Sequence, residues 1–348
     1  MTPEHTAYNP PFPPAPYGYP PYPAYYPMPY PPAYGAGAPH PSEAEIRSRM
    51  HNPPPEVLER IRAAKNAQGN ANVPEPSTNT GEMRTHAQSA PQSPQGAPID
   101  IIIPLGGESK SNNDELRILL RSIAQNASGV GKVCIVSDKA PAWLSSEVDV
   151  LKVGDSHPHN KDANIIIKVL AGIHWLGCER FCFCADDNAF LRPVDLREIP
   201  VIKNQRQISS FEPDFKAGEW HGWKKRMYHT LWLADQFGME EMWAMDCHAP
   251  QTFDARKVLE GIGRVNYRAQ PGLCIYTLFR ILEGIKDGDK QAAWKVTVEA
   301  DAPKEGEKGK GATAPLDKVF IGYNDGGFLG GLRERLLEMF PEKCRYEK

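Results

Sequence analysis

The stretch Phe181-Cys182-Phe183-Cys184-Ala185-Asp186-Asp187-Asn188 decides the fold that we expect for this chain. Its first five residues are consecutive and apolar, which is typical of a strand buried on both faces of a parallel sheet. Two adjacent acids then follow at the carboxyl end of the strand, where open α/β sheets bind ligands. Because neighbouring carboxylates repel each other, we predict a divalent cation between them that carries a nucleotide diphosphate.

Strands and helices alternate in the chain before this stretch. A β-branched strand is predicted at Ile99–Pro104, and further strands at 132–137 and 148–153. Apolar residues at helical spacing predict helices over 113–126 and 162–176. Short connections between alternating strands and helices indicate an α/β fold, with a mostly parallel sheet flanked by helices on both faces.

The chain after the stretch has a less regular pattern, with predicted helices over 226–237, 255–260, 273–285 and 328–339. A short strand is predicted at 319–323. The charged, Gly-rich segment 300–314 is typical of a mobile loop. Together with the elements of the first half, they predict a single catalytic domain over residues 98–348, a length that is sufficient for a hydrophobic core.

Residues 1–97 form a different kind of segment, rich in Pro and Tyr and poor in Val, Ile and Leu. Such a composition buries too little apolar surface to offset the entropy of ordering the chain, so we expect a disordered tail with polyproline II character. A capping-box pattern at Ser42 and an apolar face over 56–66 predict two short helices within it. Proline-recognition modules, or further copies of the tail, are the partners that this composition suits.

Charge and cysteine usage exclude several classes of protein. The net charge of −3 and the lack of a long basic run argue against electrostatically driven nucleic-acid binding, with a local basic patch as the alternative. No apolar run approaches about 18 residues and no signal peptide is evident, so we expect neither a membrane span nor secretion. The seven cysteines fall partly in predicted core strands, which favours free thiols and a cytoplasmic location.

The segment Met245-Asp246-Cys247-His248-Ala249-Pro250 is a second candidate for chemistry. Asp246 and His248 share a face if the segment is extended. His248 would then complete the metal shell or act as a general base, with Asp246 positioning it. A polar turn before Pro250 is the alternative, and an isolated Asp-x-His pattern favours that alternative. Asp186 and Asp187 have a comparable alternative as a helix cap or turn.

Three further places suit a bound nucleotide. Lys161 and Asn164 lie at the start of a predicted helix, where phosphate or sugar oxygens are well placed, although a solvated helix face explains them equally well. The loop that begins Pro104-Leu105-Gly106 could cradle the nucleotide, without the pattern of a dinucleotide fold or a P-loop. Asp138 could bind a base or ribose, or cap a turn.

Several of these blocks together carry a resemblance to a known family. In chain order they are Ile101-Ile102-Ile103-Pro104, Asn113-Asp114-Glu115-Leu116-Arg117, Leu120-Arg121-Ser122-Ile123, Val133-Cys134-Ile135-Val136-Ser137-Asp138, Pro141-Ala142-Trp143-Leu144, the stretch from Phe181 to Asp187, Asp246 with His248 and Pro250, Asn324-Asp325, and Phe340-Pro341-Glu342-Lys343-Cys344-Arg345-Tyr346-Glu347. Over most of residues 99–348 the chain resembles the Stealth sugar-phosphotransferases of capsule synthesis and related phage-encoded proteins of nucleotide-sugar type.

The resemblance implies a type-A glycosyltransferase-like fold, a nucleotide-sugar donor and Mn²⁺ or Mg²⁺. It assigns Asp186 and Asp187 to the donor-metal site and makes His248 an active-site residue. The expected activity is metal-dependent sugar transfer to a hydroxyl of a glycan, a protein or a modified phage DNA base. Two alternatives are hexose-1-phosphate transfer, as in Stealth proteins, and a non-catalytic binding protein that acts through the proline-rich tail.

Overall fold

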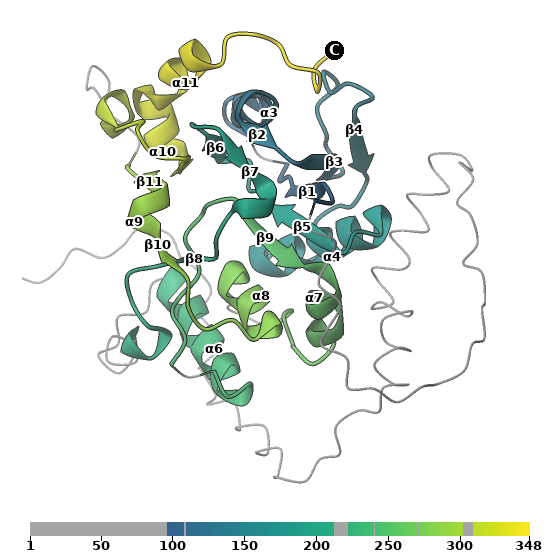
Figure 1. Ribbon diagram of the computed structural model, residues 1–348, viewed down its shortest axis with the longest axis vertical. Helices are drawn as coiled ribbons and strands as arrows, with labels where there is room; N and C mark the ends of the chain where they lie inside the picture. The colour runs from purple at the N-terminus through teal and green to yellow at the C-terminus, as the bar shows by residue number, and fades with distance from the viewer. Residues whose placement is uncertain (1–95, 108, 212–221, 240, 270–271, 302–308) are drawn as a thin grey trace, which may run out of the picture. The chain divides into compact units, whose positions relative to one another are not determined.

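The computed structural model describes residues 96–107, 109–211, 222–239, 241–269, 272–301 and 309–348 (Figure 1). The predicted tail up to residue 95, including its two short helices, lies outside the described residues, as do residues 302–308 of the predicted loop 300–314. Within the described ranges, no helix is both long and apolar enough to cross a membrane.

A five-stranded sheet forms the centre of the described fold, in the order β4-β3-β1-β5-β9. Its strands are β1 Ile99–Pro104, β3 Val130–Val136, β4 Val148–Leu151, β5 Arg180–Phe183 and β9 Gln251–Asp254. The first four are mutually parallel, which confirms the prediction of a mostly parallel sheet. Strand β9 pairs with β5 in the antiparallel direction and was not predicted, because its sequence Gln-Thr-Phe-Asp holds a single apolar residue.

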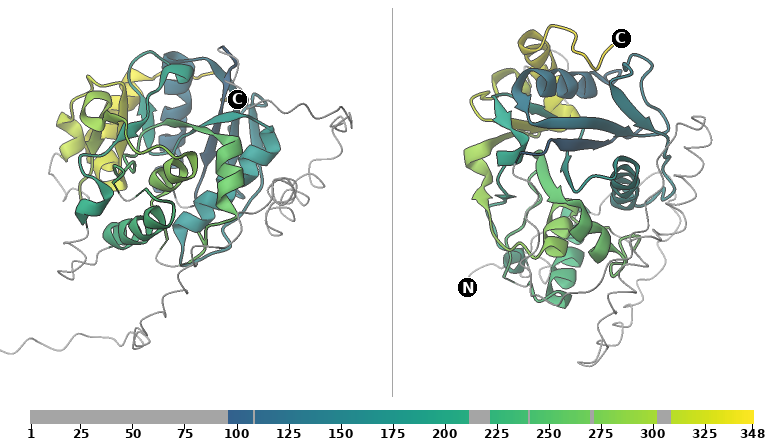
Figure 2. Two further views of the ribbon diagram at one scale, coloured as in Figure 1. Left: turned by 60° about the horizontal axis from the view of Figure 1, so that its bottom comes forward. Right: turned by 45° about the vertical axis from the view of Figure 1, so that its right-hand side comes forward.

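Helices cover both faces of this sheet, as the alternating pattern predicts. Helix α3 (Asp114–Asn126) and helix α4 (Lys161–Leu176) lie on opposite sides of the strands in the right-hand view of Figure 2. Ile101 and Ile103 of β1 share a fully buried apolar cluster with α3, whereas Ile102 between them belongs to the cluster that contains α4. The period-2 alternation of a strand therefore supplies both layers of the core.

Helices of the second half extend the layer that contains α4. They are α6 (Gly222–Gln236), α7 (Ala255–Ile262) and α8 (Ile275–Glu283), close to the predicted ranges. Their apolar side chains share one buried cluster with α4 and with Phe181 and Phe183 of β5. Ring contacts join this layer to the sheet, with Phe253 of β9 5.2 Å from Phe279 of α8, measured between ring centroids.

The order of the parallel strands reverses between β1 and β5. From β1 the chain runs outward through α3 to β3 and then to β4, after which α4 returns it to β5 on the other side of β1. The loops that leave β1 and β5 therefore diverge at the carboxyl edge of the sheet. In open α/β sheets this reversal point forms the crevice in which ligands bind.

A second sheet begins directly after the two acids of the opening stretch. It has the order β11-β12-β6, with β6 Asn188–Phe190, β11 Lys295–Val298 and β12 Phe320–Tyr323. Strand β12 pairs antiparallel with β6 and parallel with β11. Residues of the last third of the chain are thereby brought beside Asp186 and Asp187.

The helix predicted over 328–339 is interrupted, so that prediction is wrong in one respect. The chain forms α10 (Asp325–Gly327), a π-type turn over Phe328–Leu332 and then α11 (Arg333–Met339). The interruption falls at Gly330 and Gly331, and Gly331 has a φ of 98°. Only glycine adopts this conformation without steric cost, so the pair of glycines ends one helix and starts the next.

Short elements complete the description. They are β2 Ala127–Ser128, β7 Val194–Asp195, β8 Ile202–Lys203, β10 Asp289–Lys290, α9 Gln291–Trp294 and the 3₁₀ turns η1 Leu196–Glu198, η2 Ile208–Phe211 and η3 Lys310–Thr313. Strand β2 pairs with β7 and β8 with β10, in both cases in parallel.

Close packing of α4 on β1 gives a first prediction. A Cβ atom placed on Gly172 of α4 would lie 2.8 Å from Cγ2 of Ile102, which is fully buried. We therefore expect Gly172→Val to lower the free energy of unfolding by about 1–3 kcal/mol through overpacking. The same substitution at the exposed Gly263, which has open space around it, serves as the control. Urea denaturation compares the two, and equal losses would contradict the prediction.

Candidate functional site

Asp186 and Asp187 lie in the turn that leads from β5 to β6, and so from one sheet to the other. The carbonyl oxygen of Asp187 accepts hydrogen bonds from the backbone N–H of Tyr323 at 3.1 Å and from Nδ2 of Asn188 at 3.0 Å. The Asp187 side chain is nevertheless 33% exposed. The backbone is thus held in place while the carboxylate stays accessible to a ligand.

The surroundings make the charged form of both carboxyls costly. Burial, followed by the negative charge of Asp187, raises the pKa of Asp186 to about 7. Burial also raises the pKa of Asp187, although three basic groups oppose the shift: His248, Lys161 and Lys295. Two recessed carboxyls that repel each other would be stabilised by a bound cation.

His248 faces this pair from the segment before β9. Its Nδ1 lies 3.9 Å from Oδ2 of Asp187, which suits an ion pair when the imidazole is protonated but is too long for a hydrogen bond. The side chain is 52% exposed. With a φ of 44°, His248 is one of three described non-glycine residues with a left-handed backbone. Strained backbone of this kind clusters at functional sites.

Asp246 makes different contacts from His248. The segment between them is a tight turn, in which the N–H of Cys247 bonds the carbonyl oxygen of Met245 at 3.0 Å. The condition for a shared face, an extended segment, is therefore not met. Oδ2 of Asp246 instead accepts a hydrogen bond from Nε1 of Trp223 at 3.2 Å. Its role as the partner of His248 stays a prediction without a direct contact to support it.

A second acidic pair lies beside the first. Asp246 interacts electrostatically with Asp162 of α4, and burial is the main reason that the pKa of Asp162 rises to about 6. Arg226 of α6 opposes this shift and bonds Oδ1 of Asp162 at 3.1 Å. The positive charge of Arg226 therefore balances part of the negative charge on this side of the site.

Lys161 and Asn164, at the start of α4, make different contacts. Lys161 lies near the aspartates, whereas Asn164 bonds the loop that precedes the helix. Lys161 lies near enough to both aspartates to lower their pKa values. Asn164 has both ends of its amide engaged. Its Oδ1 accepts from the N–H groups of Ser156 and His157, and its Nδ2 donates to the carbonyl oxygen of His157. These bonds hold the loop after β4, and contact of Asn164 with a donor stays a prediction.

The loop after β1 lies at the same edge of the sheet. Pro104 and Leu105 are buried, and the carbonyl oxygen of Leu105 accepts a hydrogen bond from the buried Nζ of Lys168 at 2.9 Å. Gly106 is exposed with open space around it, so a nucleotide could approach the loop at this residue. Asp138 follows β3 at this edge and lies against Gly154 of the neighbouring loop.

Asn188 and three residues that the sequence patterns did not single out complete the surroundings of Asp187. Lys295 of β11 donates to the carbonyl oxygen of Cys247, and burial lowers its pKa. Asn188, Tyr276 and Tyr323 each have a buried oxygen without a hydrogen-bond partner in the described structure. Asn188 directly follows Asp187 in the chain. No local motif marks Lys295, Tyr276 and Tyr323, and only the pairing of β11 with β12, the pairing of β12 with β6 and the packing of α8 bring them to the acids.

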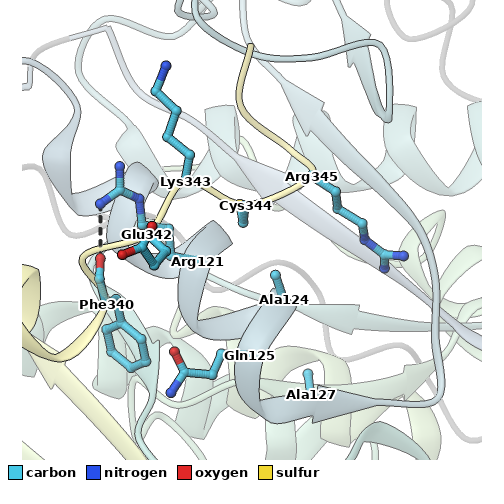
Figure 3. A pocket seen from close by; sticks show the side chains of 9 residues that line it. All are labelled: Arg121, Ala124, Gln125, Ala127, Phe340, Glu342, Lys343, Cys344 and Arg345. Carbon is cyan, nitrogen blue, oxygen red and sulfur yellow. Dashed lines mark hydrogen bonds between the residues drawn. The ribbon is translucent and has the colours of Figure 1, made fainter.

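Two cavities of the described structure lie away from these carboxylates. Their volumes are about 550 and 370 Å³, and both lie along α3 and the C-terminal segment. Figure 3 shows the larger of the two. They share Arg121, whose side chain bonds the carbonyl oxygen of Phe340 at 2.9 Å. We locate the candidate site at the aspartates rather than in these cavities, because the reversal of strand order, the repelling acids and the strained His248 coincide there.

The donor atoms suit a hard divalent cation that is only partly held by protein. Among the described residues, no group of three or more His, Cys, Asp or Glu side chains is arranged to hold a metal ion. Mg²⁺ and Mn²⁺, however, commonly bind through one or two carboxylates and complete their shell with substrate phosphates and water. Asp186 and Asp187, with the unpartnered amide oxygen of Asn188, fit that pattern.

Comparison with known proteins does not assign the chain to a family. No protein-family model matches the chain, and no curated protein matches it.

Proposed function

We propose that this protein is a metal-dependent glycosyltransferase with a type-A glycosyltransferase-like fold, which moves a sugar from a nucleotide-sugar to a hydroxyl acceptor. The observation that supports this most directly is the position of Asp186 and Asp187. They follow the strand at which the parallel order reverses, on the edge where α/β sheets bind ligands. Adjacent carboxyls at that place suit a cation–diphosphate ligand better than a neutral one.

Each nearby group then has a role in binding. Asp186 and Asp187 would hold Mn²⁺ or Mg²⁺, which stabilises the negative charge of the departing diphosphate when bound. Lys161 and Lys295 supply positive charge beside the carboxylates and would balance the remaining charge of the diphosphate. Gly106, with open space around it, leaves room for the nucleotide to approach the backbone.

His248 is the group best placed to handle the acceptor proton. Its Nδ1 faces Asp187, which leaves Nε2 of the half-exposed ring for the acceptor hydroxyl. A neutral imidazole would take that proton at Nε2, and the nearby carboxylate would stabilise the imidazolium that forms. This assignment places donor and acceptor on either side of Asp187.

A donor screen tests the proposal. Thermal unfolding is measured with UDP-, GDP- and CDP-sugars, each with and without Mn²⁺. A donor at about 100 times its dissociation constant stabilises the native state by ~2.7 kcal/mol. We therefore expect one base to raise the Tm by several degrees, and only when Mn²⁺ is present. If no donor shifts the Tm, the proposal fails, and a binding protein becomes the better account.

The product separates sugar transfer from its closest alternative. Transfer of the sugar releases a nucleoside diphosphate, whereas transfer of a hexose-1-phosphate releases a nucleoside monophosphate. The nucleotide that the protein forms from the donor identified in the screen can be resolved by ion-exchange chromatography. Release of the diphosphate is the expected result, and release of the monophosphate would show attack on phosphorus instead.

A further inference from the structure

Two tyrosine hydroxyls beside Asp187 are buried without a hydrogen-bond partner. The described structure has four buried side-chain nitrogen or oxygen atoms without a partner, and these include the hydroxyls of Tyr276 and Tyr323. The backbone N–H of Tyr323 donates to the carbonyl oxygen of Asp187 at 3.1 Å. The ring of Tyr276 lies 6.4 Å from that of His248, whose Nδ1 is 3.9 Å from Asp187. Buried polar groups in folded proteins are nearly always paired, so two unpaired phenols at one site require an explanation.

Packing prevents either phenol from turning to find another partner. The ring of Tyr323 stacks on Phe328, with 4.9 Å between centroids and 13° between planes. The ring of Tyr276 packs on Phe183 at 4.8 Å, and lies 6.4 Å from the ring of His248. The hydroxyls are therefore held in place by the same aromatic contacts that stabilise the core.

Phenylalanine at either position would keep these ring contacts and avoid an unsatisfied group. An unpaired buried hydroxyl is destabilising, so tyrosine is the less stable choice in the unliganded protein. A cost of this kind at a candidate site indicates that the hydroxyl gains a partner in another state of the protein. Burial raises the pKa of both phenols well above the usual value, so both remain O–H donors.

We propose that Tyr276 and Tyr323 are positioning residues, whose hydroxyls donate to the Asp187 carboxylate when it holds a divalent cation bound to a diphosphate. The inference rests on the proposed function and extends it to two residues that would hydrogen-bond the Asp187 carboxylate. Groups that hydrogen-bond a metal-binding side chain orient it, and their loss typically weakens metal binding 10–100-fold. The two phenols, from α8 and β12, would fix Asp187 from two sides of the site.

The test compares Tyr276→Phe and Tyr323→Phe with the control Tyr346→Phe. The hydroxyl of Tyr346 already accepts a hydrogen bond from Arg345 at 2.8 Å, in the C-terminal segment. Thermal unfolding without ligand should show the first two variants to be as stable as the wild type or more stable, and the control no more stable. Calorimetric titration with Mn²⁺ and the nucleoside diphosphate of the preferred donor should show 10–100-fold weaker binding for the first two alone.

Three other outcomes would contradict either the positioning role of the two tyrosines or the proposed function. If the wild type binds the Mn²⁺–nucleotide pair and both tyrosine variants bind it equally well, the positioning role is wrong and the proposed function stands. If the variants lose stability and binding together, the hydroxyls are structural and the inference also fails. If the wild type binds neither Mn²⁺ nor nucleotide, the proposed function is wrong, and the inference falls with it.

Discussion

We expect the replacement of Asp187 by Asn to abolish Mn²⁺-dependent nucleotide binding and to leave the unliganded protein as stable as before, or more stable. The carboxylate would be the main anionic ligand for the cation, and a neutral amide is a far weaker one. We expect at least a 100-fold loss of affinity, and a loss of 10²–10³-fold or more in turnover. Stability should not fall, because burial already disfavours the charged carboxyl. Calorimetric titration and thermal unfolding measure the two effects.

Asp317→Asn is the matched control for this experiment. Asp317 is exposed on the segment before β12, and the same change of charge there should alter neither nucleotide binding nor stability by more than about 0.5 kcal/mol. Unchanged binding and turnover in Asp187→Asn would contradict the proposed site. A loss of the folded state in Asp187→Asn would instead show that the acid has a structural role.

Replacing Glu347 by Ala is expected to cause the largest loss of stability. Only 3% of its side chain is exposed, and it accepts hydrogen bonds from Nε of Arg117 at 3.1 Å and from Nε of Arg121 at 2.7 Å. Alanine would leave two largely buried guanidinium groups without their common partner. Removal of one member of a buried ion pair costs about 3–5 kcal/mol, which chemical denaturation can measure.

Glu342→Ala provides the control, since Glu342 lies five residues away in the same segment but is exposed. It should change the free energy of unfolding by less than about 0.5 kcal/mol. Comparable losses in the two variants would mean that the segment, rather than the ion pair, is responsible.

The stabilisation by Glu347 should depend on pH in a defined direction. Burial favours a higher pKa for this carboxyl, but the hydrogen bonds from Arg121 outweigh it and the net pKa is lowered. A carboxyl with a lowered native pKa stabilises the fold above its unfolded pKa, about 4.3, and loses that contribution as the pH falls through the native pKa. The stability difference between Glu347→Gln and wild type should therefore be greatest above about pH 5 and shrink below it.

Local patterns were sufficient for most elements of the parallel sheet. The β-branched run of β1 and the apolar spacing of α3 and α4 predicted elements within one or two residues of those observed. Strand β9 escaped prediction because a four-residue strand with one phenylalanine has no distinctive period. The break at Gly330 and Gly331 escaped because apolar spacing continues across the two glycines, and spacing alone carries no information on φ.

By itself, the sequence determined that two acids follow a buried strand in an α/β protein, because a strand buried on both faces is encoded by a run of consecutive apolar residues, here five. Only the tertiary structure decided what surrounds those acids. Lys295, Tyr276 and Tyr323 come from separate elements that reach Asp187 through strand pairing and helix packing between distant parts of the chain. Such contacts depend on strand order and on the direction of each side chain, which no local period encodes.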